Sequence, residues 1–126
     1  MSRTPIEQVA FGVLGPLPRF APYKRFRSRI YVPSDTRKWR TRVATAFLEA
    51  GGRRPKKDEQ VFVYVRFTMV KSHADLDSLY HSLQDALSRD ALHCVDKEWH
   101  FQVYHRRRHV SQKSQESVLV EVTYGR

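Results

Sequence analysis

Three aspartates, Asp75, Asp77 and Asp96, are the residues of this chain whose types and spacing best fit chemistry. They belong to a chain with a formal net charge of +10, where clustered carboxylates would weaken the hold on an acidic partner. A divalent cation held between them would turn that local repulsion into attraction and would supply a Lewis acid. We therefore expect these carboxylates to bind a metal ion that assists hydrolysis of a phosphodiester.

Two of the three aspartates also have a purely structural explanation. Asp75 suits the N-cap of a helix, and Asp77 lies in its first turn, where the helix dipole favours negative charge. Asp96 stands where a loop enters a strand, and a return of the chain after the helix could bring it close to the other two. Magnesium suits such a set because it prefers a few carboxylate oxygens together with substrate phosphate.

The charge of the chain is high and uneven. Lys and Arg number 23 against 13 Asp and Glu, and the sequence pI is about 10.2. Thirteen of the basic residues lie between Arg19 and Lys57, with only Asp35 and Glu49 to oppose them. This imbalance predicts nucleic-acid binding rather than binding to an acidic membrane, because no basic amphipathic helix of the membrane type is present.

The residues expected to contact DNA backbone are spread along the chain: Lys24, Arg25, Arg27, Arg37, Arg40, Arg53, Arg54, Lys56, Lys57, Arg106, Arg107 and Arg108. Singly, each could be an ordinary solvated charge. Phe20, Tyr23 and Phe26 alternate with basic residues and could stack at an opened junction or pack an arm onto the protein body.

The single cysteine, Cys94, excludes an internal disulfide and fits a reducing compartment. The chain lacks an apolar run long enough for a membrane span and lacks a signal-peptide core, so we expect a cytoplasmic, nucleoid-associated protein of a bacterium or a phage. The chain has six histidines in addition to Cys94, and together they are only a weak pattern for a zinc site. We expect neither a small-molecule cofactor nor a membrane partner.

The length of 126 residues predicts a single domain, residues 1–126. We expect strands at 8–14, 61–70, 99–104 and 118–124, and helices from Ser34 or Asp35 to about Ala50 and from Asp75 to Arg89. Residues 19–32 are expected to form a loop leading into an irregular strand, and 106–116 a turn or loop.

The two apolar faces of 61–70 indicate a central strand or a face covered by a partner chain. Trp39 and Trp99 are expected in the core. The fold class is α+β, a small mixed sheet of about four to five strands with two main helices.

Three segments resemble the RusA family of Holliday junction resolvases: Asp75-Leu76-Asp77-Ser78-Leu79, Gln84-Asp85-Ala86-Leu87 and Val95-Asp96-Lys97-Glu98-Trp99. Leu14-Gly15-Pro16-Leu17-Pro18 is similar to the first strand and Pro-rich turn of that family. The resemblance implies a symmetric homodimer of α+β fold that uses magnesium or manganese. It would resolve four-way junction DNA by paired nicks, in recombination and repair. Asp75 and Asp77 take the positions of the two motif aspartates, and Asp96 that of the second acid of a later pair.

The chain departs from the family pattern at three positions. Ser78 stands where the family usually has Asn, Val95 replaces the first acid of the later pair, and His81 replaces a functional Lys. A neutral imidazole holds a phosphate less well than an ammonium group. Protonated His81 could still serve catalysis, because Asp77 and Asp85 lie four residues before and after it on a helix.

Two other functions remain open. One is a protein that binds branched DNA without cutting it, which the change at His81 keeps in view. The other is a basic RNA-binding domain in which the aspartates only cap a helix.

Overall fold

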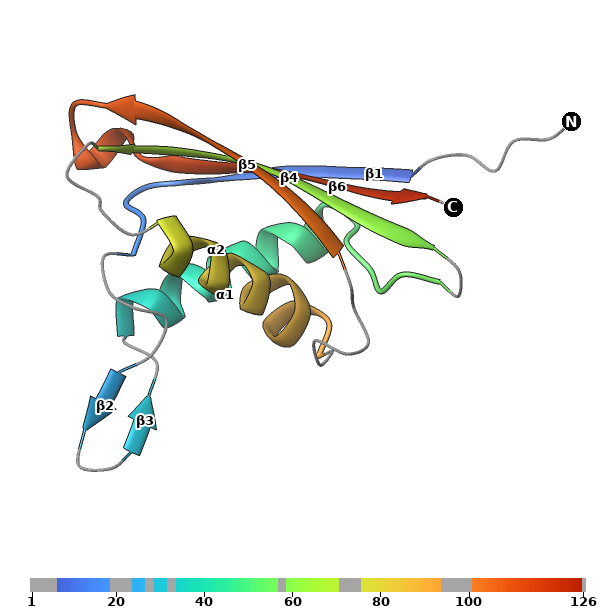
Figure 1. The fold of residues 1–126 in the computed structure, drawn as a ribbon, viewed down its shortest axis with the longest axis horizontal. Coiled ribbons are helices and arrows are strands. Elements are labelled where there is room, and N and C mark those ends of the chain that lie inside the picture. The colour runs from blue at the N-terminus through green and yellow to red at the C-terminus, as the bar shows by residue number, and fades with distance from the viewer. Residues whose placement is uncertain are drawn as a thin grey trace, which may run out of the picture.

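Four strands form one mixed sheet, and two helices cover one of its faces (Figure 1). The computed structural model describes residues 7–18, 24–26, 29–31, 34–56, 59–70, 76–93 and 101–125, and only the backbone at 24–26, 29–31, 76–77 and 101–106. The elements in chain order are β1 (Glu7–Leu14), β2 (Lys24–Phe26), β3 (Arg29–Tyr31), α1 (Ser34–Glu49), β4 (Gln60–Val70), α2 (Leu76–Asp85), the π-helical turn η1 (Ala86–Ala91), β5 (Phe101–Val110), the 3₁₀ turn η2 (Lys113–Gln115) and β6 (Ser117–Gly125). The α+β class expected from the sequence is confirmed.

The strand order in the sheet is β1-β6-β4-β5. The last strand, β6, lies inside the sheet and pairs antiparallel with both β1 and β4, so that Glu7 is opposite Tyr124. Strand β5 is parallel to β4, and α2 and η1 occupy the connection between them. The predicted central position of β4 is confirmed, since it has a neighbour on each side.

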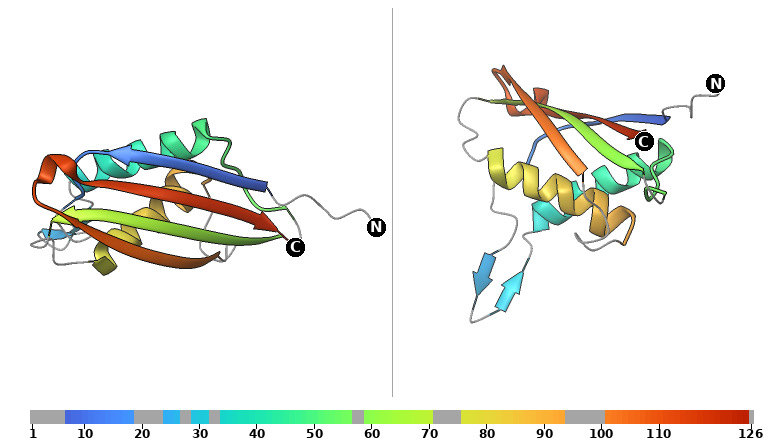
Figure 2. Two further views of the ribbon diagram at one scale, coloured as in Figure 1. Left: turned by 90° about the horizontal axis from the view of Figure 1, so that it is seen from above. Right: turned by 45° about the vertical axis from the view of Figure 1, so that its right-hand side comes forward.

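One face of the sheet packs against the helices. Alternate residues of β4 and β6 are buried on that face, as expected for strands whose side chains alternate. The core combines Val63, Val65, Phe67, Val118, Val120 and Val122 of the sheet with Val43, Phe47, Leu79, Leu83 and Leu87 of the helices. The opposite face is left uncovered by both helices, as the view from above shows (Figure 2).

Helix α1 begins and ends close to the predicted residues. Its buried stripe includes Trp39, Val43 and Phe47, which lie at helical spacing. The helix stops because Gly51 adopts a φ of 101° and the N–H of Gly52 returns to the carbonyl of Phe47 at 2.8 Å. A Cβ at Gly52 would collide with the Phe47 ring, so only glycine fits there.

The second helix changes its winding near its end. The predicted helix from Asp75 to Arg89 is α-helical from Leu76 to Asp85 and continues as the π-helical turn from Ala86 to Ala91. Asp75 lies outside the described residues. The α2 segment starts near the end of the sheet where β4 and β5 finish, and it runs back beneath the sheet (Figure 1).

The predicted loop at Arg106–Arg108 is wrong. These arginines belong to β5, which continues to Val110 in register with β4. An edge strand accepts consecutive charged residues because solvent reaches its side chains, and such residues lack the apolar alternation by which strands are predicted.

Within the predicted loop at 19–32, β2 and β3 form a small antiparallel hairpin. This hairpin projects on the helix side, away from the sheet (Figure 1).

Candidate nuclease site and nucleic-acid interface

Helix α2 carries two of the residues predicted to act in catalysis. Leu79 and Leu83 are each 1 % exposed and fix the inner side of the helix. Asp77 and His81 are four positions apart, which is about one turn of α2. The His81 side chain is exposed, and its ring lies edge-on to that of Tyr80 with 6.0 Å between centroids. Asp77 is thus in the first turn of α2, near the end of the sheet where β4 and β5 finish (Figure 1).

The structure does not test whether the three aspartates converge. Asp75 and Asp96 lie outside the described residues, and Asp77 is described by its backbone alone. In the part of the chain that is described, no three His, Cys, Asp or Glu side chains come together in a way that could hold a metal ion. The donor set predicted from the sequence still suits magnesium, because all three of its members offer carboxylate oxygens.

Asp85, expected to support His81, takes part in ion pairs with arginines. Its carboxylate lies 4.0 Å from the guanidinium of Arg40 and 3.7 Å from that of Arg89. Arg40 also makes two hydrogen bonds of 2.8 Å to the carboxylate of Asp90. The Arg40 side chain is only 12 % exposed, so this two-pronged contact fastens α1 to η1.

Arg53 is likewise used inside the protein. It donates to the carboxylates of Glu7 and Glu59 at distances of 2.6 to 3.1 Å, and its guanidinium lies 4.2 Å from the centre of the Tyr124 ring. The hydrogen bond from Arg53 lowers the pKa of Glu59 to about 2, with help from the Lys56 backbone N–H, and it also lowers the pKa of Glu7. The Tyr124 hydroxyl donates to the Arg53 carbonyl at 2.7 Å, while burial raises the pKa of that hydroxyl. Arg53 thus joins β1, β6 and the segment before β4.

Arg54 donates to the carbonyl of Leu92 at 2.7 and 3.0 Å and to that of His93 at 3.3 Å. It therefore holds the end of η1. Of the twelve residues predicted to contact DNA, Arg40, Arg53 and Arg54 consequently have structural roles that local sequence does not reveal.

For the other residues predicted to contact DNA, the structure describes the side chain of some and only the backbone of others. Arg37 and Lys56 have exposed side chains, and so do Arg107 and Arg108 near the end of β5. Lys24, Arg25 and Arg106 are placed by their backbones on β2 and β5, and Arg27 and Lys57 lie outside the described residues.

Arg107 and Arg108, near the end of β5, are paired with β4 residues that face opposite sides of the sheet. Arg107 is in register with Phe67, which faces the helices, and Arg108 is in register with Thr68, on the uncovered side. The end of β5 where they lie is also the end near which α2 begins (Figure 1). The exposed Arg107 and Arg108 therefore lie on a strand that finishes at the end of the sheet where α2, the helix that carries Asp77, begins.

Glu116 is a buried carboxylate near the same end of the sheet that was not predicted from the sequence. Glu116 is 1 % exposed, and its carboxylate accepts hydrogen bonds from the backbone N–H groups of Leu17 at 3.2 Å and Val70 at 2.9 Å. It ties the turn after β1 to the last residue of β4. Glu116 follows a polar run, 111–115, and nothing in that run indicates burial.

Among the six histidines that form the weak zinc pattern, His81, His93 and His109 are exposed, and only the backbone of His105 is described. Trp39 is 3 % exposed, as predicted for the core. His73, Cys94, Trp99 and His100 lie outside the described residues, as do Phe20 and Tyr23.

Comparison with protein-family models gives no match, and neither does comparison with curated proteins. No helix in the described part of the chain has the length and apolar character to cross a membrane.

Proposed function

We propose that this protein is a magnesium-dependent, structure-selective endodeoxyribonuclease that resolves four-way DNA junctions by paired nicks, as RusA-family proteins do. Asp75, Asp77 and Asp96 would hold the ion, for which manganese could substitute. When bound, the ion would polarise the scissile phosphate and help generate the attacking hydroxide. The sequence resemblance around these aspartates is the origin of the proposal.

One structural observation carries it. The first turn of α2, which contains Asp77, starts at the same end of the sheet as the end of β5, the strand that carries the exposed Arg107 and Arg108. A nuclease needs carboxylates for its cation and fixed cations for the flanking phosphates, and we propose that α2 supplies the first and β5 the second. The basic hairpin of β2 and β3 projects from the helix side, where it could reach a second DNA arm.

The test is cleavage of a synthetic four-way junction in the presence of magnesium, compared with duplex and flap DNA. We expect Asp77→Asn to lower the cleavage rate by about 100-fold or more, as loss of a metal ligand does, while junction binding is retained. Asp75→Asn and Asp96→Asn should give equal losses. Asp35→Asn is the matched control, because Asp35 also lies in the first turn of a helix and has no assigned role.

Cleavage that persists in any of the three variants would reject the role of that aspartate. A second candidate is a junction-binding protein without nuclease activity, which is favoured by the exposed imidazole of His81 and by the pairing of Asp85 with arginines. It predicts tight, salt-sensitive junction binding and no products with any divalent metal. Preference for RNA over junction DNA would instead indicate the RNA-binding alternative.

A further inference from the structure

The face of the sheet that neither helix covers carries exposed apolar side chains (Figure 2). Four large apolar side chains are exposed in the described part of the chain. Three of them, Leu14, Tyr64 and Leu119, stand at the alternate positions of β1, β4 and β6 that face away from the helices. Because exposed apolar side chains gathered on one face mark interaction sites, this face is a candidate binding surface.

Strand β4 supplies the centre of this face. Phe62, Tyr64, Arg66 and Thr68 occupy every second position of the strand and alternate with buried residues. Phe62 is half-buried, Tyr64 is 37 % exposed, and Arg66 is exposed. Two aromatic rings followed by a cation therefore run along the middle of the uncovered face.

The neighbouring strand β5 adds further positive charge. Arg108 is exposed and is in register with Thr68, and the backbone of Arg106 is in register with Arg66. Among the described residues of this face, the one acid is the half-buried Glu121 of β6. The face therefore combines aromatic rings with a net positive charge.

Aromatic rings and cations at this spacing fit an unpaired nucleic-acid strand. Successive side chains on one face of a strand are about 7 Å apart, which is about twice the 3.4 Å rise per nucleotide of a duplex strand. Neighbouring bases can therefore lie on both Phe62 and Tyr64 only after they have separated from each other. Unstacked bases bind aromatic side chains on a four-stranded sheet, while nearby cations bind the phosphates.

We propose that the uncovered face of the sheet binds single-stranded DNA, with bases on Phe62 and Tyr64 and phosphates at Arg66 and Arg108. Charge favours a nucleic acid over a protein partner, because arginines interrupt the apolar side chains in a chain of net charge +10. Phe62, Tyr64 and Arg66 are not among the residues predicted from the sequence to contact DNA. The choice of DNA rests on the proposed function, since opening a junction exposes unpaired bases.

The test is binding of a labelled oligo-dT of about 16 nucleotides, measured by fluorescence anisotropy without divalent metal. We expect the single strand to bind about 10-fold more tightly than a duplex of the same length. Tyr64→Ala should weaken binding by about 10-fold and leave the salt slope unchanged, because it removes a ring and no charge. Tyr64→Phe is the matched control, since it keeps the ring, and it should bind as the wild type does.

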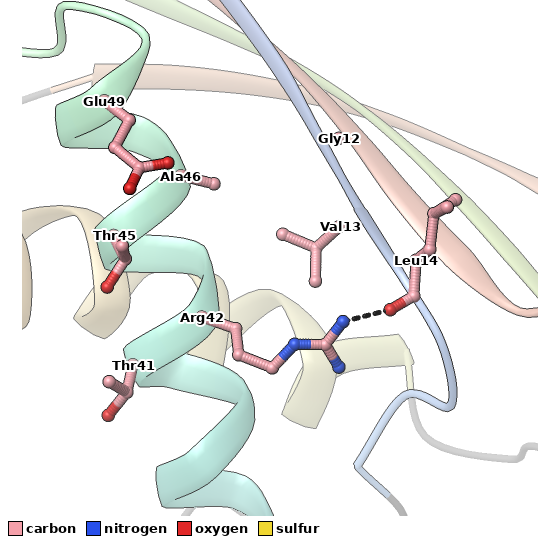
Figure 3. Close-up of a pocket in the computed structure, with 8 residues that line it drawn as sticks. All are labelled: Gly12, Val13, Leu14, Thr41, Arg42, Thr45, Ala46 and Glu49. Atoms are coloured by element: carbon pink, nitrogen blue, oxygen red, sulfur yellow. Dashed lines mark hydrogen bonds between the residues drawn. The ribbon is translucent and has the colours of Figure 1, made fainter.

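Arg66→Gln separates the effect of charge from that of stacking. It should reduce the salt slope of the association constant by about 0.7, the value for one phosphate contact on a single strand. Arg42→Gln is the charge control. Arg42 lies outside the face, in the groove between α1 and β1, where it donates to the Leu14 carbonyl (Figure 3). The described lining of that groove includes Glu49 and no aromatic ring, so Arg42→Gln should leave the slope unchanged.

Equal affinity for the single strand and the duplex would overturn the proposal. Unchanged binding by both Tyr64→Ala and Arg66→Gln, folded by circular dichroism, would overturn it as well. Tighter binding to RNA of the same length would reject the assignment to DNA. If light scattering shows that Tyr64→Ala separates a dimer, the face is a contact between subunits and the proposal fails.

Failure of this proposal and failure of the nuclease proposal give different results. The oligo-dT assay contains neither a junction nor a metal ion. Junction cleavage without oligo-dT binding would therefore reject only the single-strand surface. Oligo-dT binding that depends on Tyr64, without junction cleavage in magnesium, would reject only the nuclease.

Discussion

The carboxylate of Glu116 and the backbone N–H of Val70 are 2.9 Å apart at a buried position, although 46 residues separate them in the chain. Val70 is the last residue of β4 and is followed by the segment that leads to Asp77. The contact therefore fixes the end of β4, from which the chain continues to the candidate nuclease residue Asp77.

We expect Glu116→Gln to lower the free energy of unfolding by about 1 to 3 kcal/mol. An amide has only one acceptor oxygen, so the N–H of either Leu17 or Val70 would face an NH₂ group in a buried place. Urea denaturation measures the change. Glu121 lies on β6, which begins directly after Glu116, and is only half buried, so Glu121→Gln should change stability by less than about 0.5 kcal/mol; equal effects would contradict the assigned role.

The ion pair of Glu59 and Arg53 should make stability depend on acid. The folded-state pKa of Glu59 is about 2, below its ordinary value of 4.5, because the carboxylate accepts hydrogen bonds from Arg53 and from the Lys56 backbone. The pair contributes fully above about pH 4.5, and its contribution is lost as pH falls from about 4.5 to about 2. We expect Glu59→Gln to flatten the fall of the melting temperature across that window. An unchanged slope would show that Glu59 contributes nothing to it.

Two buried serines near α2 should respond oppositely to alanine. Among the described residues the buried hydroxyl of Ser82 has no hydrogen-bond partner, whereas Ser88 donates to the carbonyl of Gln84 at 2.8 Å. Because Ser82→Ala removes an unsatisfied polar group and improves helix propensity, we expect it to stabilise the protein by about 1 kcal/mol. Ser88→Ala should be neutral or destabilising by a similar amount. Chemical denaturation of both variants, side by side, decides the matter.

The exposed arginines of β5 should differ from the internally paired Arg40 in their effect on DNA binding. Replacing Arg107 and Arg108 together by Gln should weaken junction binding and reduce the salt slope of the association constant by up to about 1.8, since each lost phosphate contact removes about 0.9. Arg40→Gln should instead lower stability by about 1 kcal/mol and leave the slope unchanged. Fluorescence anisotropy titrations at several salt concentrations provide the comparison. An unaltered slope in the double variant would place the DNA elsewhere.

Magnesium should stabilise the folded protein if the aspartates bind it. At a concentration about 100 times its dissociation constant, the ion should add about 2.7 kcal/mol to the stability, seen as a rise in melting temperature. Asp77→Asn should reduce that rise, and Asp35→Asn should not. A wild-type protein that melts at the same temperature with and without magnesium would speak for the RNA-binding alternative and against a metal site.

Elements with strong local signals were predictable from the sequence. The glycines after Glu49 predicted where α1 ends, and the doubly apolar strand around Val65 predicted its place inside the sheet. The extension of β5 through Arg106–Arg108 was not predictable from periodicity, because charged residues at a sheet edge mask it. The π-helical winding after Asp85 had no recognised signal either.

The carboxylates that pair with Arg40 and Arg53 could not be predicted from the sequence either. Arg40 finds Asp90 fifty residues away, and Arg53 finds Glu7 across 46, which are tertiary contacts that no local pattern contains. For the candidate site itself, the structure places Asp77 and His81 on α2, and the meeting of Asp75, Asp77 and Asp96 stays a prediction.

The position of β6 between β1 and β4 has a consequence for synthesis of this protein. Strand β6 follows β1 and β4 in the chain and joins them, so neither β1 nor β4 can complete its ladder before β6 has been synthesised. The nascent chain therefore carries two unsatisfied strand edges until β6 has emerged from the ribosome. Loss of the nine residues of β6 would separate β1 from the rest of the sheet, so their removal should be far more damaging than their number suggests.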